Sequence, residues 1–135
     1  MGRFLTVTRQ LPDVALVSPA LRARQTLEVA MQTGNWDCEV QTCEALYGEV
    51  DEVLDAIHSK GEAAKLLLIV GHEPTWSRLA SKLTNGATLR LPTASMLRLD
   101  FEAEVWRAVG DGGRISWLVT PRLLYRTPLA SSKGL

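Results

Sequence analysis

Two segments of the sequence share one pattern, in which a short apolar run ends in a sharp turn and a helical stretch follows. In the first segment, residues 14–17 lead into Ser18-Pro19, and in the second, residues 66–70 lead into Gly71-His72-Glu73-Pro74. Continuous apolar runs of this length are typical of strands that are covered on both faces, as in parallel sheets. The pattern therefore predicts an α/β fold with a mostly parallel sheet.

The hydrophobic periodicity of the remaining sequence predicts how helices and strands alternate around these two segments. A helix is expected over about residues 19–33, with Ser18 as its N-cap and Pro19 at its first position. The other expected elements are a strand at 39–42, a helix from Gly48 to Gly61, a helix from about 75 to Asn85-Gly86, a strand at 96–101, and a hairpin of 105–109 and 115–119 around the glycine-rich turn at 110–113. The class is therefore α/β with an antiparallel addition near the C-terminus.

The length of 135 residues fits one domain, which we expect to span residues 1–124, with a flexible tail at 125–135. The 15 basic and 15 acidic side chains give a net charge of zero, which argues against a dedicated nucleic-acid-binding protein. No apolar run approaches the roughly 18 residues of a membrane span, and residues 1–6 lack the apolar stretch of a secretory signal. We therefore expect a cytoplasmic protein without a nucleic acid or a membrane as partner.

Several reactive residue types have an ordinary structural interpretation. Cys38 and Cys43 cannot make a disulfide framework or a complete zinc site, so we expect two packed thiols, with a catalytic cysteine as the alternative. His58 is expected near a helix C-terminus, where an imidazole is favoured by the helix dipole. The carboxylates Glu44, Glu49 and Asp51 lie between a strand and a helix, where we expect exposed loop residues, with a recruited general acid as the alternative.

Arg22 and His72 are the candidate binding residues. Arg22 is expected in the first turn of its helix and His72 just before the next one, and both follow strands of the predicted sheet. In open α/β sheets ligands bind beyond the carboxyl ends of the strands, where helix N-termini favour anions. A guanidinium matches phosphate oxygens, and a histidine can donate to the same anion. The alternative interpretation is a solvated Arg22 and a His72 that hydrogen-bonds loop backbone.

Four segments resemble the histidine phosphatase superfamily. Residues 18–26, Ser-Pro-Ala-Leu-Arg-Ala-Arg-Gln-Thr, resemble its S-P-x-x-R-A-x-Q-T segment, and Val70-Gly71-His72-Glu73-Pro74 resembles its G-H-x-P segment. Residues 91–94 and 117–122 look like the compact SixA-type phosphohistidine phosphatases. The resemblance extends from Gly2 to about Leu124, and the four segments occur in the family's order.

This resemblance implies a phosphoglycerate mutase-like, three-layer α/β/α fold and a hydrolase. In the family a histidine of an R-H-G motif accepts the phosphoryl group from the substrate, and water then hydrolyses the phosphohistidine. Arg22 matches the second arginine and His72 the second histidine, so both are expected to be catalytic and to bind phosphate. The implied partners are a phosphorylated protein or a small phosphoester, and phosphate or sulfate as a bound anion. No metal or organic cofactor is implied.

The sequence departs from the family because R-H-G does not occur in it. The family's first strand and its nucleophile would precede Met1, and we expect that strand to lie between the strands matched to residues 14–17 and 66–70. The chain as given is therefore expected to be truncated and inactive, and to be poorly soluble or to dimerise through the open strand edges.

Three explanations of this departure remain open. The reading frame could start at an internal methionine of a longer, active enzyme. Alternatively, the chain is a noncatalytic, phosphate-dependent binding or regulatory module. The third explanation is a deliberate truncation or a mistaken assignment to the family.

Overall fold

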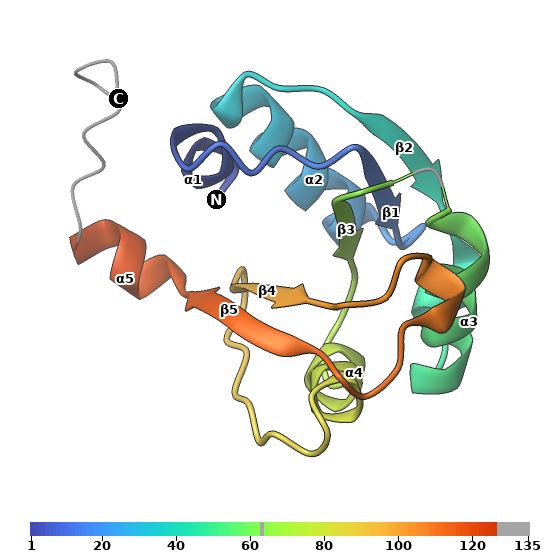
Figure 1. The fold of residues 1–135 in the computed structure, drawn as a ribbon. Coiled ribbons are helices and arrows are strands. Elements are labelled where there is room, and N and C mark those ends of the chain that lie inside the picture. The colour runs from blue at the N-terminus through green and yellow to red at the C-terminus, as the bar shows by residue number, and fades with distance from the viewer. Residues whose placement is uncertain (63, 127–135) are drawn as a thin grey trace.

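A computed structural model describes residues 1–62 and 64–126 of the chain (Figure 1). The elements follow one another as α1 (Gly2–Val7), β1 (Val14–Val17), α2 (Leu21–Gly34), β2 (Glu39–Thr42), the 3₁₀ helix η1 (Glu44–Tyr47), α3 (Val50–Lys60), β3 (Leu67–Val70), α4 (Thr75–Leu83), β4 (Met96–Asp100), the 3₁₀ helix η2 (Trp106–Ala108), β5 (Arg114–Val119) and α5 (Pro121–Arg126). The expected α/β class is confirmed. Helix α5 includes the first two residues of the expected tail, and residues 127–135 of that tail lie outside the described residues.

The strands form two sheets. A parallel sheet has the order β2-β1-β3, and an antiparallel sheet consists of β4 and β5. Strands β1 and β3 pair directly, with Val14 opposite Leu67 and Val17 opposite Val70. In this chain, the two segments that were expected to flank the family's first strand therefore pair with each other. Their facing backbone groups satisfy each other, for example through the Ser18 N–H, which donates to the Val70 carbonyl at 3.0 Å.

The antiparallel pair near the C-terminus is confirmed, but its first strand is β4 rather than residues 105–109. Tertiary contacts hold part of the latter segment in the short helix η2. The indole N–H of Trp106 donates to the Ala64 carbonyl at 2.6 Å, and the Trp106 ring meets Phe101 edge-on. These contacts anchor the segment in the connection between β4 and β5 and leave β4 to pair with β5.

The start of α2 also differs from the expectation. The helix begins at Leu21 and Ala20 is its N-cap residue, so Ser18 is not the N-cap. The Ser18 hydroxyl instead accepts a hydrogen bond from the Ala20 N–H at 3.2 Å and faces His72. At its other end, α2 includes Gly34 and stops at Asn35, which has the left-handed conformation common at helix ends.

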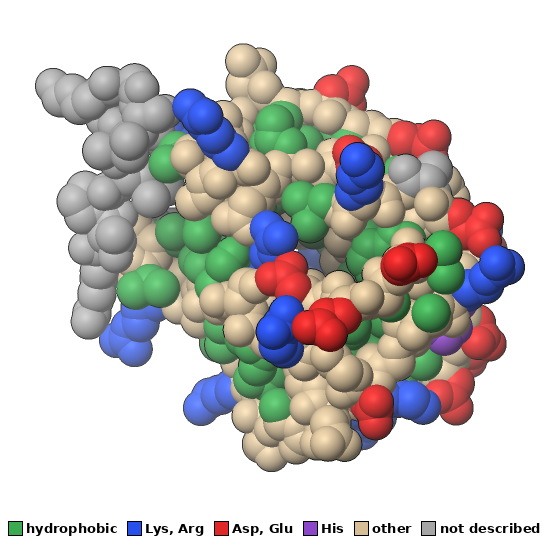
Figure 2. Space-filling view, viewed as in Figure 1, with side chains coloured by type: hydrophobic (Ala, Val, Ile, Leu, Met, Phe, Trp, Pro, Cys, Tyr) green, Lys and Arg blue, Asp and Glu red, His purple; other side chains and the backbone are tan. Residues whose placement is uncertain are grey.

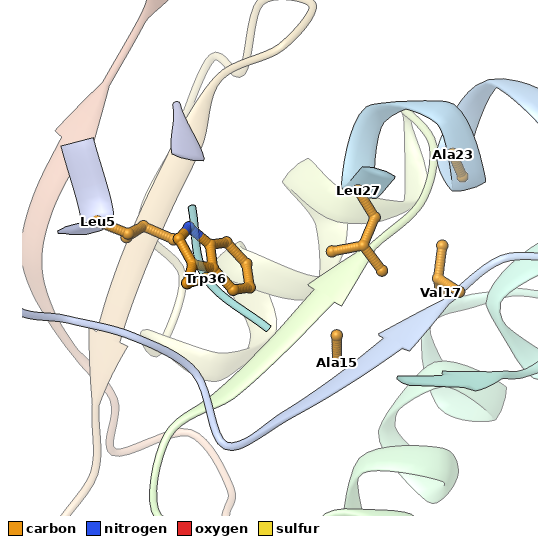
Figure 3. Packing of buried hydrophobic residues seen from close by; sticks show 6 residues of the cluster. All are labelled: Leu5, Ala15, Val17, Ala23, Leu27 and Trp36. Atoms are coloured by element: carbon orange, nitrogen blue, oxygen red, sulfur yellow. The ribbon is translucent and has the colours of Figure 1, made fainter. Parts of the chain in front are cut away.

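The core lies on both faces of the fully buried strand β1, which gives the molecule its three layers. On one face, Ala15 and Val17 pack against α1 and α2; Figure 3 shows this cluster of Leu5, Ala15, Val17, Ala23, Leu27 and Trp36. On the other face, Val14 and Leu16 pack against residues from η1 and α3. The expected α/β/α arrangement is thus observed, because successive side chains of a central strand enter opposite layers.

Helices α1 and α2 pack closely enough to require glycine at position 2. A Cβ atom added to Gly2 would overlap the backbone of Ala30. The Trp36 indole N–H donates to the Gly2 carbonyl at 3.1 Å, and the Thr6 hydroxyl donates to the Gly34 carbonyl at 2.6 Å. The contact therefore depends on backbone atoms, which cannot move aside as a flexible side chain can.

Replacing Gly2 by alanine tests this packing. Gly2→Ala is expected to lower the free energy of unfolding by about 1–3 kcal/mol, because overpacking forces backbone shifts. Urea denaturation followed by circular dichroism measures the change. Gly110→Ala is the matched control, since a Cβ at Gly110 meets no atom within 4 Å. Equal stabilities of the two variants would contradict the observed packing.

Asp13 fixes the start of β3. Its carboxylate accepts hydrogen bonds from the N–H groups of Lys65 and Leu66, both at 2.9 Å. These bonds, the one from Leu66 first, hold the pKa of Asp13 below its ordinary value. Because this pKa is lower in the folded protein, the contribution to stability is full above the ordinary carboxyl pKa and is lost as pH falls through the lowered one.

Asp13→Asn is therefore expected to destabilise the chain at neutral pH, because the charged acceptor is removed. The difference in unfolding free energy between the wild type and this variant should shrink as pH falls below about 4, where the wild-type carboxyl becomes protonated. Denaturation series at several pH values measure it. The exposed Asp111→Asn control should match the wild type at neutral pH. A difference independent of pH would contradict this role.

The sequence predicts no membrane-spanning segment. Within residues 1–62 and 64–126, no helix combines the length and the apolar character that crossing a membrane requires.

On the face drawn in Figure 2, acidic and basic side chains are interspersed, with hydrophobic side chains between them.

Candidate functional site

The candidate site is built where β1 and β3 end side by side. Because Val17 lies opposite Val70, the turns that begin at Ser18 and Gly71 are neighbours in space. The Ser18 Oγ lies 2.9 Å from the His72 Nε2, and the Ser18 side chain is fully buried. With the Ala20 N–H donating to the same oxygen, the hydroxyl is held in place from two sides and fixes one edge of the imidazole.

Tyr47 holds the face of the same imidazole. The two rings are stacked, with centroids 5.8 Å apart and planes at 6°. Tyr47 ends η1, which is anchored by the buried Leu46, while the phenol itself is 60% exposed. Sequence reasoning missed this residue, because nothing in the pattern around position 47 indicates that it meets a histidine 25 positions further on.

Arg22 lies in the first turn of α2 and is exposed to solvent. Helix α2 follows the Ser18 turn directly, so Arg22 and His72 flank the same carboxyl edge of the sheet. The second arginine of this segment, Arg24, donates a hydrogen bond from its Nε to the Pro19 carbonyl at 3.1 Å, so its side chain is bound to the backbone that precedes α2. Of these two arginines, Arg24 is thus bound to backbone, and Arg22 is exposed at the start of the helix that follows the Ser18 turn.

Two of the three carboxylates that were considered as possible acids have structural partners. Glu49 lies 3.8 Å from Arg78, and Asp51 forms an ion pair with Lys82 at 2.8 Å. The Glu49 N–H also donates to the side chain of Glu52, within the first turn of α3. Glu44 is exposed in η1. These contacts favour the interpretation of Glu49 and Asp51 as surface residues that support α3 and α4.

His58 serves the structure, as expected. His58 lies in the last turn of α3, and its Nε2 is 2.8 Å from the carbonyl oxygen of Val109, a residue distant in the sequence. Glu73, next to His72, accepts a hydrogen bond from the Ser77 N–H at 2.7 Å and another from the Ser77 hydroxyl, so it binds the first turn of α4. Only His72 of the two histidines thus lies at the candidate site.

The loop segment at 91–94 approaches the same region. Residues 91–93 line, with Glu73 and Ser77, a shallow hollow of about 500 Å³ beside α4. Ala94 in this loop has a positive φ of 61°. The second segment of the SixA-type resemblance, 117–122, spans the end of β5 and the start of α5. Because Met96 pairs with Val119, the loop at 91–94 leads directly into the strand that lies beside this segment.

The cysteines and acidic residues give no sign of a metal centre. Both Cys38 and Cys43 are free thiols, and burial raises the pKa of Cys38, which disfavours the reactive thiolate. In the part of the chain that the structure describes, no group of three or more His, Cys, Asp or Glu side chains could hold a metal ion.

Comparison with known sequences finds uncharacterized relatives. Two proteins from two strains of Mycobacterium tuberculosis are each 40% identical to this chain over 85 residues. The match covers 62% of this chain and 51% of each relative, so it spans about half the length of these relatives. No family model matches the sequence.

Comparison with solved structures identifies the fold. A SixA protein from Nakamurella multipartitia superposes with a TM-score of 0.75 and 24% identity, over 89% of this chain and 77% of that one. A protein histidine phosphatase SixA complexed with tungstate gives 0.74 and 22%, over 91% and 78%. A SixA protein from Agrobacterium tumefaciens gives 0.72 and 21%, over 89% and 75%. The chain therefore has the fold of these SixA proteins.

Proposed function

We propose that this chain carries the phosphate-binding half of a phosphohistidine phosphatase-type site. The observation that carries the proposal is the 2.9 Å contact between the Ser18 Oγ and the His72 Nε2. This contact fixes an imidazole at the carboxyl edge of a parallel sheet, next to the helix that bears Arg22. Such an edge is where α/β proteins bind anionic ligands.

In this proposal Arg22 and His72 bind the oxygens of one phosphoryl group. The Arg22 guanidinium presents a planar set of N–H donors that matches two phosphoryl oxygens, and its charge opposes theirs. His72 adds an N–H donor, and the Ser18 and Tyr47 contacts keep its ring in one orientation. Support comes from the structural neighbour that is complexed with tungstate, a tetrahedral oxyanion like phosphate.

The proposed reaction has two displacements. The phosphoryl group passes from a phosphohistidine protein or a small phosphoester to a nucleophilic histidine, and the leaving group departs with its electron pair. Water then attacks phosphorus, the bond to the histidine breaks, and inorganic phosphate leaves. Arg22 and His72 stabilise the negative charge of the transferring group in both steps.

We assign the nucleophilic histidine to a segment outside these 135 residues. Within the chain, His58 is engaged with the Val109 carbonyl, and His72 is the residue that the family resemblance matches to the phosphate-binding histidine. The 135-residue chain by itself is therefore proposed to bind phosphate without turning over substrate. Its proposed location is the cytoplasm. The same observation favours a second candidate function, a noncatalytic module that binds phosphorylated ligands.

Oxyanion binding by variants of the chain tests the proposed site. Tungstate and phosphate, titrated by isothermal calorimetry, are expected to bind the wild type. Arg22→Ala and His72→Ala should each weaken binding at least about tenfold, because each removes a hydrogen bond to a charged group. Arg114→Ala is the charge-matched control and should change the affinity little, since Arg114 is exposed on β5 in an ion pair with Glu102.

Two results would contradict the proposal. Equal affinities of the wild type, Arg22→Ala and His72→Ala would remove the site. Hydrolysis of an aryl phosphate by the 135-residue chain above background, abolished in His72→Ala, would show that the nucleophile lies within the chain.

Ser18→Ala tests the positioning of His72. This variant is expected to weaken oxyanion binding about two- to tenfold, because the imidazole loses a hydrogen bond that orients it. The measurement is a double-mutant cycle: in the His72→Ala background, Ser18→Ala should have no further effect on the affinity. Equal losses in both backgrounds would show that Ser18 acts through the fold and not through His72.

A further inference from the structure

The buried Ser18 hydroxyl stands between a backbone N–H and an imidazole nitrogen. Its oxygen accepts the Ala20 N–H at 3.2 Å and lies 2.9 Å from the His72 Nε2, while the side chain is fully buried. Among the residues that the structure describes, these two groups are its hydrogen-bond partners. Because a hydroxyl carries a single proton, the nature of its partners determines where that proton points.

The Ser18 proton points to His72. The Ala20 N–H is a donor and cannot accept, so the remaining partner, the His72 Nε2, must supply the acceptor lone pair. If Nε2 carried a proton instead, the Ser18 oxygen would receive two donors, and its own proton would be buried without an acceptor. Such an unsatisfied donor is costly and rare in protein interiors. Ser18 is therefore the donor of this hydrogen bond.

The direction of this bond determines the state of the other ring nitrogen. A histidine whose Nε2 accepts a hydrogen bond is neutral and carries its ring proton on Nδ1. In the part of the chain that the structure describes, the His72 Nδ1 has no hydrogen-bond partner, and no side-chain nitrogen or oxygen is both buried and unpartnered. The Nδ1–H is therefore open to solvent, on a half-buried ring at the sheet edge that Arg22 flanks.

The other groups next to the ring leave both nitrogens as they are. Tyr47 stacks on the face of the imidazole with the two planes at 6°, so it covers the ring and not its nitrogen lone pair. The carboxylate that follows in the chain, Glu73, accepts from the N–H and the hydroxyl of Ser77. Within residues 1–62 and 64–126, the hydrogen bond that orders the His72 ring thus comes from Ser18.

We propose that His72 carries its proton on Nδ1 and that this N–H, oriented by donation from Ser18 to Nε2, is the donor that holds a phosphoryl oxygen. The ligand in this statement rests on the proposed phosphate site, whereas the tautomer does not, since Ser18 meets His72 without a ligand. Ser18 is then a positioning residue, because its hydroxyl is too buried to reach a ligand and acts through the ring. His72 is a donor to the phosphoryl group and not a base, because Ser18 occupies the lone pair of the neutral ring.

The second histidine of the chain provides an internal reference. The His58 Nε2 lies 2.8 Å from the Val109 carbonyl, and a carbonyl oxygen can only accept. His58 therefore carries its proton on Nε2, the opposite arrangement to His72. Because the chain has two histidines, one spectrum should contain one ring of each kind.

Nitrogen-15 NMR of the labelled, ligand-free 135-residue chain tests the tautomer at about pH 8, above the ordinary histidine pKa of about 6.5. Correlations between the carbon-bound ring protons and the ring nitrogens distinguish the two tautomers. We expect one Nδ1–H ring, whose signals disappear in His72→Ala, and one Nε2–H ring. Ser18→Ala should remove the preference of His72 for Nδ1–H, whereas the control Ser116→Ala, an exposed serine on β5, should leave it unchanged.

Two amide variants test which nitrogen meets the ligand. The amide nitrogen of asparagine can take the place of Nδ1 and that of glutamine the place of Nε2, because each stands the same number of bonds from the Cβ atom as the nitrogen that it replaces. In a calorimetric titration with tungstate, His72→Asn is expected to bind at least about threefold more tightly than His72→Gln, because it retains the donor that faces the ligand.

Three results would overturn the proposal. An Nε2–H pattern for His72 in the wild type would show that Ser18 accepts the bond, and a ring with both nitrogens protonated at about pH 8 would show a cationic His72. Equal tungstate affinities of His72→Asn and His72→Gln, or tighter binding by the latter, would show that Nδ1 does not hold the ligand. A wild-type chain that binds no tungstate contradicts the proposed phosphate site itself, and the ligand-free spectrum separates that failure from a wrong tautomer.

Discussion

The direct parallel pairing of β1 and β3 is the constraint on which the candidate site depends. It sets Val17 opposite Val70, so two turns that are far apart in the chain begin at the same edge. The contact between Ser18 and His72 follows from that register, and a shift by one residue would turn the side chains of one strand to the other face. Burial of β1 on both faces makes such a shift costly, because apolar side chains fill both layers.

The same pairing decides where the two sheets separate. Since β3 uses one edge for β1, its other edge faces β4 across a cavity, and side chains of the two sheets pack against each other around it. The site edge is therefore supported by a complete part of the sheet, while the separation lies on the far side of β3.

Much of the fold follows from local patterns. The apolar runs at 14–17 and 66–70, the helix that stops at Gly61 and the strand at 39–42 all appear where periodicity predicts them. The errors occur where tertiary contacts override local signals. Residues 105–109 have strand-like composition, but Trp106 binds the Ala64 carbonyl and the segment curls into η2. Ser18 has an ideal N-cap sequence, but its buried hydroxyl faces His72 instead.

By itself, the sequence determined most of the segments that become strands and helices, and it determined that Arg22 and His72 follow strands of the sheet, because these properties depend on near neighbours in the chain. Only the tertiary structure decided that β1 and β3 pair directly and that Tyr47 stacks on His72. It also decided that the open edges of β3 and β4 share one cavity. These features join residues tens of positions apart, and their energies depend on burial and register, which no local pattern encodes.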